Sequence, residues 1–123
     1  MIVEPARTVE KPWGSELWVA VTDSYCLKII ELRAGQRSSL QYHERKHEHI
    51  YVDRGRAKIE FKGPDGALVC EIIGPGTIVE NKPGAIHRVE ALDDLRLIEV
   101  QTPHLDDVVR VEDDHGRLGA AHG

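Results

Sequence analysis

Residues Gly35–Gly55 read GQRSSLQYHERKHEHIYVDRG, and the spacing within this stretch decides how the whole chain is interpreted. Gln41 and His43 are two residues apart, so on a strand they point to the same face. The polar residues after His43 favour a chain reversal, and residues 48–53 then read as a second strand. A hairpin of this kind brings Glu48 back beside His43.

This hairpin would gather an amide oxygen, an imidazole and a carboxylate at one point. Such a donor set suits a divalent metal of borderline hardness. His87 supplies a further imidazole, because it follows the turn signal Lys82-Pro83-Gly84 and begins another predicted strand. We therefore predict one divalent metal ion, zinc first and manganese, iron or nickel as alternatives. The predicted ligands are Gln41, His43, Glu48 and His87. The alternative is an ordinary polar turn with no bound ion.

Size and charge exclude several functional classes. The 123 residues suffice for one domain with one core, and the net charge of -5 argues against a nucleic-acid partner. No apolar run approaches the roughly 20 residues needed to span a bilayer. Glu4 and Pro5 stand where a signal peptide would be apolar, so we expect a cytoplasmic protein. Cys26 and Cys70 lack a CxxC spacing and are expected to be reduced thiols.

The remaining sequence predicts short strands at even spacing, separated by Gly- and Pro-rich turns. The predicted strands are 16–22, 25–33, 56–62, 67–73, 77–81, a strand from His87, and 95–102. About nine or ten strands without a helix are typical of an all-β sandwich or barrel. Residues 1–14 are interpreted as an N-terminal extension with a short strand, 106–110 as a short turn, and 112–123 as a flexible tail.

Several strings in the chain carry a resemblance to a known family. They are KPWG (11–14), SLQYH (39–43), EH (48–49), HR (87–88), IEVQ (98–101) and DDVVRVEDDHGR (106–117). With them the chain resembles the cupin superfamily, and more narrowly the cupin domain of type II mannose-6-phosphate isomerases. Gln41 stands where many cupins have their first histidine, and Lys82 stands where a proline is usual. The resemblance implies a single cupin domain over residues 1–123, folded as a jelly-roll β-barrel.

The same resemblance implies a metal-dependent aldose–ketose isomerase acting on a sugar phosphate. Glu99 shares a strand face with Leu95 and Leu97 and is the candidate base if that face lines the barrel. The candidate substrate-binding residues are Lys28, Arg37, Ser39, Arg88 and Gln101. Arg110 and Arg117 belong to a family string, with surface ion pairing as the alternative. Trp13 is interpreted as a plug of the barrel floor rather than a sugar-stacking platform.

Two other functions remain open at this point: a different metal-dependent cupin enzyme, such as a dioxygenase or lyase, and a non-catalytic carbohydrate or small-molecule binding module. We expect a homodimer through an outer sheet face that carries Trp18, Ile98 and Val100. His49 should face away from Glu48 and serve sheet packing or the dimer contact, and His47 should be a solvated loop residue.

Overall fold

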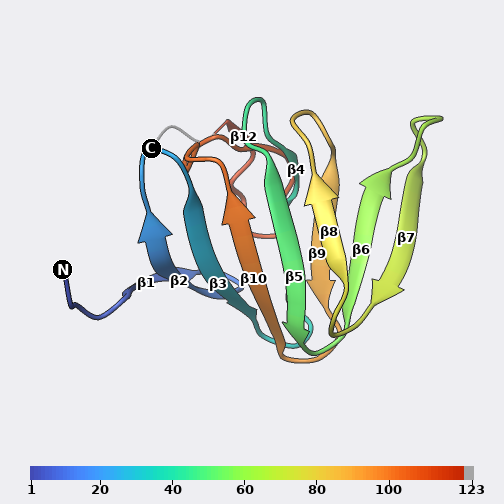
Figure 1. Cartoon of the computed structure of the whole chain (residues 1–123). Coiled ribbons are helices and arrows are strands. Elements are labelled where there is room, and N and C mark those ends of the chain that lie inside the picture. The colour runs from blue at the N-terminus through green and yellow to red at the C-terminus, as the bar shows by residue number, and fades with distance from the viewer. Residues whose placement is uncertain (121–123) are drawn as a thin grey trace.

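Two antiparallel sheets of six strands each make up the protein (Figure 1). The structure is a computed structural model that describes residues 1–120, and no helix occurs among them. The first sheet has the order β1 (Arg7–Lys11), β2 (Gly14–Val21), β3 (Cys26–Leu32), β10 (Leu95–Gln101), β5 (Glu48–Arg54) and β8 (Ile78–Asn81). The second has the order β12 (Gly119–Ala120), β11 (Val109–Glu112), β4 (Leu40–Tyr42), β9 (His87–Ala91), β6 (Ala57–Lys62) and β7 (Leu68–Ile73). The part of the chain described holds no helix capable of crossing a membrane.

Alternating side chains build the core between the sheets. Along β3, β5 and β10 every second residue is buried and its neighbours are more exposed, as the period of a strand requires. Burial of apolar surface on this inner face supplies the main favourable term in folding. The apolar core consists of Trp13, Ile30, Leu32, Ile50, Val52, Ala57, Ala91, Leu95 and Leu97.

The inward face changes character along the strands. Apolar residues fill one end of β3, β5 and β10, whereas the inward positions at the other end are Lys28, Glu48 and Glu99, all buried. The register places Glu99 opposite Lys28 and Gln101 opposite Glu48. Burying charged groups is costly unless they have partners. The polar end of the interior therefore holds the candidate functional groups, and the apolar end contributes most of the stability.

Two glycines are required by close backbone approach. A Cβ on Gly14 would lie 1.9 Å from the carbonyl oxygen of Glu31, so the turn into β2 admits no side chain. Gly55, between β5 and β6, has a φ of 85°, and a Cβ there would lie 2.4 Å from the carbonyl oxygen of Asp94. Glycine alone adopts this left-handed conformation without strain.

Strands also occur near both ends of the described residues 1–120. Part of the predicted extension, Arg7–Lys11, pairs with β2 as an edge strand, and Trp13 enters the core. The predicted turn at 106–110 leads into strand β11, which pairs with β4, and the tail adds β12. Two carboxylates of the tail hold this segment in place: Asp114 forms an ion pair with Arg37, and Asp113 forms one with Arg117. The last part of the predicted flexible tail, 121–123, lies outside the described residues.

Candidate metal centre

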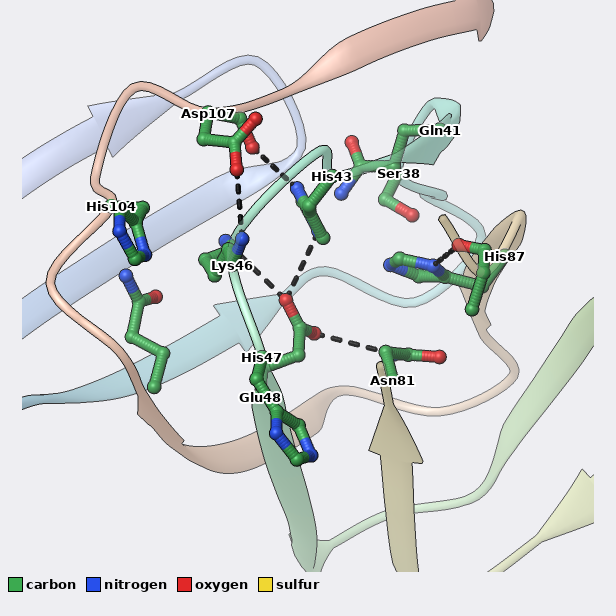
Figure 2. Close-up of polar contacts among 12 residues, drawn as sticks. Ser38, Gln41, His43, Lys46, His47, Glu48, Asn81, His87, His104 and Asp107 are labelled. Atoms are coloured by element: carbon green, nitrogen blue, oxygen red, sulfur yellow. Dashed lines mark hydrogen bonds and ion pairs between the residues drawn. The ribbon is translucent and has the colours of Figure 1, made fainter. Parts of the chain in front are cut away.

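Three buried side chains meet at the polar end of the barrel. His43 follows β4, and Glu48 and His87 open β5 and β9. Their ligand atoms all lie within 4.8 Å of one another, and His43 Nε2 is 3.1 Å from Glu48 Oε1. The two imidazole centroids are 5.2 Å apart (Figure 2). We call these three residues the inner cluster.

The hydrogen bonds of the two histidines direct their lone pairs inward. His43 Nδ1 lies 2.6 Å from the backbone oxygen of Asp107, and His87 Nδ1 lies 2.8 Å from that of Ala85. A carbonyl oxygen only accepts, so each Nδ1 carries the hydrogen and each Nε2 is left with a free lone pair. This arrangement is the usual support of a metal-binding histidine.

The inner cluster leaves polar atoms unsatisfied. Within residues 1–120, His43 Nε2 and Glu48 Oε1 are buried and have no well-directed hydrogen bond, although they face each other and the Lys46 ammonium lies 3.3 Å from the carboxylate oxygen. Buried polar atoms rarely go without a partner, and a proton or a cation between these two atoms would satisfy both. A divalent ion satisfies both atoms, so the inner cluster fits a metal.

Charges around the inner cluster favour the metal-binding protonation states. Burial opposes ionisation of Glu48, but the contact with His43 and the charge of Lys46 outweigh it and lower its pKa. Burial lowers the pKa of His87, which is therefore neutral near pH 7. Metals require an ionised carboxylate and neutral imidazoles. The shifts of Glu48 and His87 are in the direction that metal binding requires.

Gln41, the fourth predicted ligand, lies beside the inner cluster. It pairs with His87 across β4 and β9 and lines the same cavity. Its Oε1 accepts a hydrogen bond of 2.6 Å from the Ser39 hydroxyl, so Ser39 orients the amide. Gln41 as a metal ligand remains a prediction.

Lys46 is a buried cation that the sequence did not reveal. Asp107 accepts hydrogen bonds from the backbone N–H groups of Glu44, Arg45 and Lys46, at 3.0, 2.6 and 2.8 Å. These bonds fold the loop inward and bring Lys46 Nζ to 3.3 Å from Glu48 Oε1 (Figure 2). Burial lowers the Lys46 pKa, but the negative charges of Glu99 and Glu48 outweigh this effect. The pKa is therefore raised overall, and the ammonium stays charged. No local signal marks Lys46, since its position depends on Asp107, 61 residues away.

The inner cluster opens into a cavity of about 140 Å³. Ser39 and Lys28, predicted as substrate-binding residues, and Glu99, predicted as the base, line this cavity. Lys28 Nζ lies 3.4 Å from Glu16 Oε1, so this lysine is paired at the cavity wall. Burial and the negative charge of Glu48 raise the pKa of Glu99 to about 8. Such a carboxyl near its midpoint can accept and release a proton.

Two predicted phosphate-binding cations point elsewhere. The Arg37 guanidinium donates hydrogen bonds of 2.6 and 2.7 Å to Asp114 in the tail, and it does not line the cavity. Arg88 is buried on the face of β9 opposite His87, where it donates to the backbone oxygens of Ser38 and Glu112. The structure therefore does not bring either predicted phosphate-binding side chain to the cavity, because Asp114 holds Arg37 and backbone oxygens hold Arg88.

Gln101, predicted to bind substrate, is buried but does not line the cavity. Its amide donates to the backbone oxygen of Thr102 at 3.2 Å. Other cations replace the missing ones at the cavity wall: Lys11, Arg110 and Arg117. Arg110 Nε is buried and has no partner within residues 1–120. Burial and the neighbouring Arg117 charge lower the Arg110 pKa.

A double-sheet β-fold with a buried His/Glu cluster at one end of its interior defines the cupin class. Two solved structures share this fold. Oxalate decarboxylase from Bacillus subtilis at pH 4.6 superposes with a TM-score of 0.74 and 16% sequence identity, covering 86% of this chain and 30% of that one. KdgF from Halomonas sp. gives a TM-score of 0.69 and 21% identity, covering 80% of this chain and 88% of that one.

Sequence comparison identifies the family to which the chain belongs within the cupin class. The family model "Mannose-6-phosphate isomerase C-terminal" matches residues 2–113, so the chain belongs to that family. Mannose-1-phosphate guanylyltransferase of Escherichia coli (strain K12) is 32% identical over 117 residues, which are 91% of this chain and 23% of the relative. Xanthan biosynthesis protein XanB of Xanthomonas campestris pv. campestris (strain B100) is 33% identical over 116 residues, 90% of this chain and 24% of the relative. The chain thus spans about a quarter of these relatives' length.

Proposed function

We propose that this domain is a metal-dependent aldose–ketose isomerase for a sugar phosphate, of the mannose-6-phosphate type. The observation that carries the proposal is the buried inner cluster beside Glu99 in one cavity, in a chain of the mannose-6-phosphate isomerase C-terminal family. His43, Glu48 and His87, with Gln41 as the fourth ligand, would hold one divalent ion, zinc first. When bound, such an ion polarises the carbonyl and hydroxyl oxygens of the open-chain sugar and stabilises charge that develops on them.

Glu99 is assigned the proton transfer between C1 and C2. Glu16 is held by Lys28 and Glu48 by Lys46, which leaves Glu99 as the cavity carboxyl with a base's environment. The ionised carboxylate removes the proton from C2 and returns it to C1, while the hydroxyl proton on O2 is lost and one is gained on O1. Aldose becomes ketose with no net change in atoms. General acid–base groups of this kind contribute about 10²–10⁴-fold.

The phosphate is assigned to Arg110, in place of Arg37 and Arg88. Arg110 offers a buried, unpartnered Nε within residues 1–120 and suffers repulsion from Arg117, whose own guanidinium is paired with Asp113. An anion beside Arg110 would satisfy the buried donor and offset this repulsion, since guanidinium matches phosphate in a bidentate geometry.

A coupled assay with mannose-6-phosphate tests the activity. Wild-type protein should turn over the sugar, lose activity in EDTA and regain it with zinc, and elemental analysis after purification without added metal should show one ion in the inner cluster. His43→Ala is the background control. Turnover no higher than that of His43→Ala would refute the isomerase.

Arg110→Ala tests the phosphate assignment separately. We expect a KM for mannose-6-phosphate raised by at least about tenfold, as the loss of one charged hydrogen bond costs about 1.5–3 kcal/mol. Arg37→Ala is the matched control, because that guanidinium faces the tail. Equal KM values for Arg110→Ala and Arg37→Ala would show that Arg110 does not bind the phosphate.

A further inference from the structure

A second group of metal-ligand side chains lies on the outer side of β5. His47 immediately precedes this strand, His49 lies within it, and Glu80 belongs to the neighbouring strand β8, opposite His49 in register. Their ligand atoms also lie within 4.8 Å of one another. We call His47, His49 and Glu80 the outer cluster. It shares no residue with the inner cluster.

The period of the strand separates the two clusters. Glu48 is buried and points inward, so its neighbours His47 and His49, which are more exposed, point outward. His47 and His49, two residues apart, stack with ring centroids 5.4 Å apart and an interplanar angle of 29°. Half-exposed side chains leave the outer cluster open to solvent ions.

Both outer imidazoles converge on a single carboxylate oxygen. Glu80 Oε2 lies 2.7 Å from His47 Nε2 and 3.4 Å from His49 Nε2. The hydrogen bond from His47 lowers the pKa of Glu80, so the carboxylate is ionised at neutral pH. Two imidazole nitrogens and one carboxylate oxygen on neighbouring strands form a three-sided ligand set with open positions for water.

We propose that the outer cluster is a second metal site that binds a divalent transition-metal ion, such as zinc. Imidazole donors favour such ions over magnesium or calcium, which prefer oxygen. β8 is the last strand of its sheet, so a bound ion would fasten this edge strand to β5. Because the ion binds only the folded state, it would raise the midpoint of thermal unfolding as its concentration rises.

Zinc stoichiometry of the full chain tests this proposal, measured by titration calorimetry and by elemental analysis after equilibrium dialysis. Wild-type protein should bind one zinc ion more than His49→Ala and Glu80→Gln. In both variants the surface affinity should fall by at least about 100-fold, since even outer partners of a metal ligand cost about 10–100-fold. His115→Ala removes an exposed histidine of the tail and should bind as wild type does.

The same experiment distinguishes the inner metal site from the outer one. Glu48→Gln should remove the inner ion and leave the zinc-dependent rise in thermal midpoint that depends on His49. Failure of the inner site therefore does not hide the outer one. Equal zinc stoichiometry in wild type, His49→Ala and Glu80→Gln, with all three folded by thermal unfolding, would overturn the proposal.

Discussion

On the two sides of strand β5, the same set of three side chains, two histidines and one glutamate, lies in opposite surroundings. The inner cluster combines two histidines and a glutamate, all buried, and the outer cluster combines the same types at the surface. Each carboxylate also has a lysine nearby, Lys46 inside and Lys82 outside. Because the residue types match, burial is the main difference between the two clusters.

Burial changes what each cluster costs and what it can do. Inside, removing water strengthens every charge interaction and leaves Nε2 of His43 without a hydrogen bond in the described chain, so a metal or a proton is required. Outside, water screens the charges, and ion pairs there contribute roughly 0–1 kcal/mol. Chemistry is therefore expected inside, and reversible ion binding outside.

The sharpest test of this comparison exchanges one carboxylate for an amide on each face. Glu48→Gln should lose the inner metal and at least about a thousandfold in isomerase kcat/KM, because Lewis-acid stabilisation is worth several kcal/mol. Glu80→Gln, the matched control, should keep isomerase activity within twofold of wild type. Similar losses in both variants would break the comparison.

Replacing the paired lysines should separate the faces by stability. Lys46→Met leaves Glu48 buried without its ammonium partner and should cost the metal-free protein about 3–5 kcal/mol. Lys82→Met alters only a surface charge and should stay within about 0.5 kcal/mol. Urea unfolding in the presence of a chelator measures both free energies. A Lys46→Met loss below that of Lys82→Met would contradict the buried ion pair.

Glu99→Gln should lower kcat by about 100-fold or more and change the pH dependence of stability. The folded-state pKa of about 8 lies above the ordinary 4.5, so the native state binds more protons than the unfolded state between these values. Wild-type stability in chelator should therefore fall as pH rises from about 4.5 to about 8. Glu99→Gln should lack this decline, which unfolding measured at several pH values within the window tests. A decline that persists in the variant would contradict the role of Glu99.

Asp107→Ala should loosen the loop that delivers Lys46. The substitution leaves three backbone N–H groups without their acceptor and should cost about 1–3 kcal/mol, with weaker inner-metal binding as a consequence. Asp106→Ala is the adjacent control, because Asp106 is exposed. Denaturant unfolding and zinc titration measure both effects, and equal metal affinity in the two variants would argue against a positioning role.

The smallest effect is expected from His49→Ala without added metal. Its side chain is half-exposed and its 3.4 Å contact with Glu80 is a surface pair, so stability should change by less than about 1 kcal/mol. Adding zinc should enlarge the difference from wild type, since only the intact outer cluster gains from the ion. Thermal unfolding with and without zinc measures this change.

Local patterns predicted the elements well and the connections between them poorly. Alternation in 56–62 and 95–102 predicted strands close to β6 and β10, because each strand buries its own face whatever its partners are. The short strands near residues 109–120 could not be predicted in this way. β11 pairs with β4 and Asp114 binds Arg37, and no residue of the tail reveals these partners.

The residues around the cavity fall into the same two groups: those whose positions follow from local spacing and those that distant partners place. Spacing within one hairpin brought His43 and Glu48 together, since a strand's period is fixed by its backbone. The spacing of residues said nothing about Lys46, which Asp107 places, or about Arg37, which Asp114 removes from the cavity. Long, flexible side chains take the best partner within reach, and that partner is a distant residue.

Strand period and turn chemistry act over a few residues, so the amino-acid sequence was enough to predict the all-β architecture and the histidines and glutamate at the polar end of the barrel. Three features emerge only in the folded chain: which lysine is buried, which arginines reach the cavity, and that His47 and His49 meet Glu80. Sheet register sets these encounters, and register depends on contacts between residues far apart in the chain.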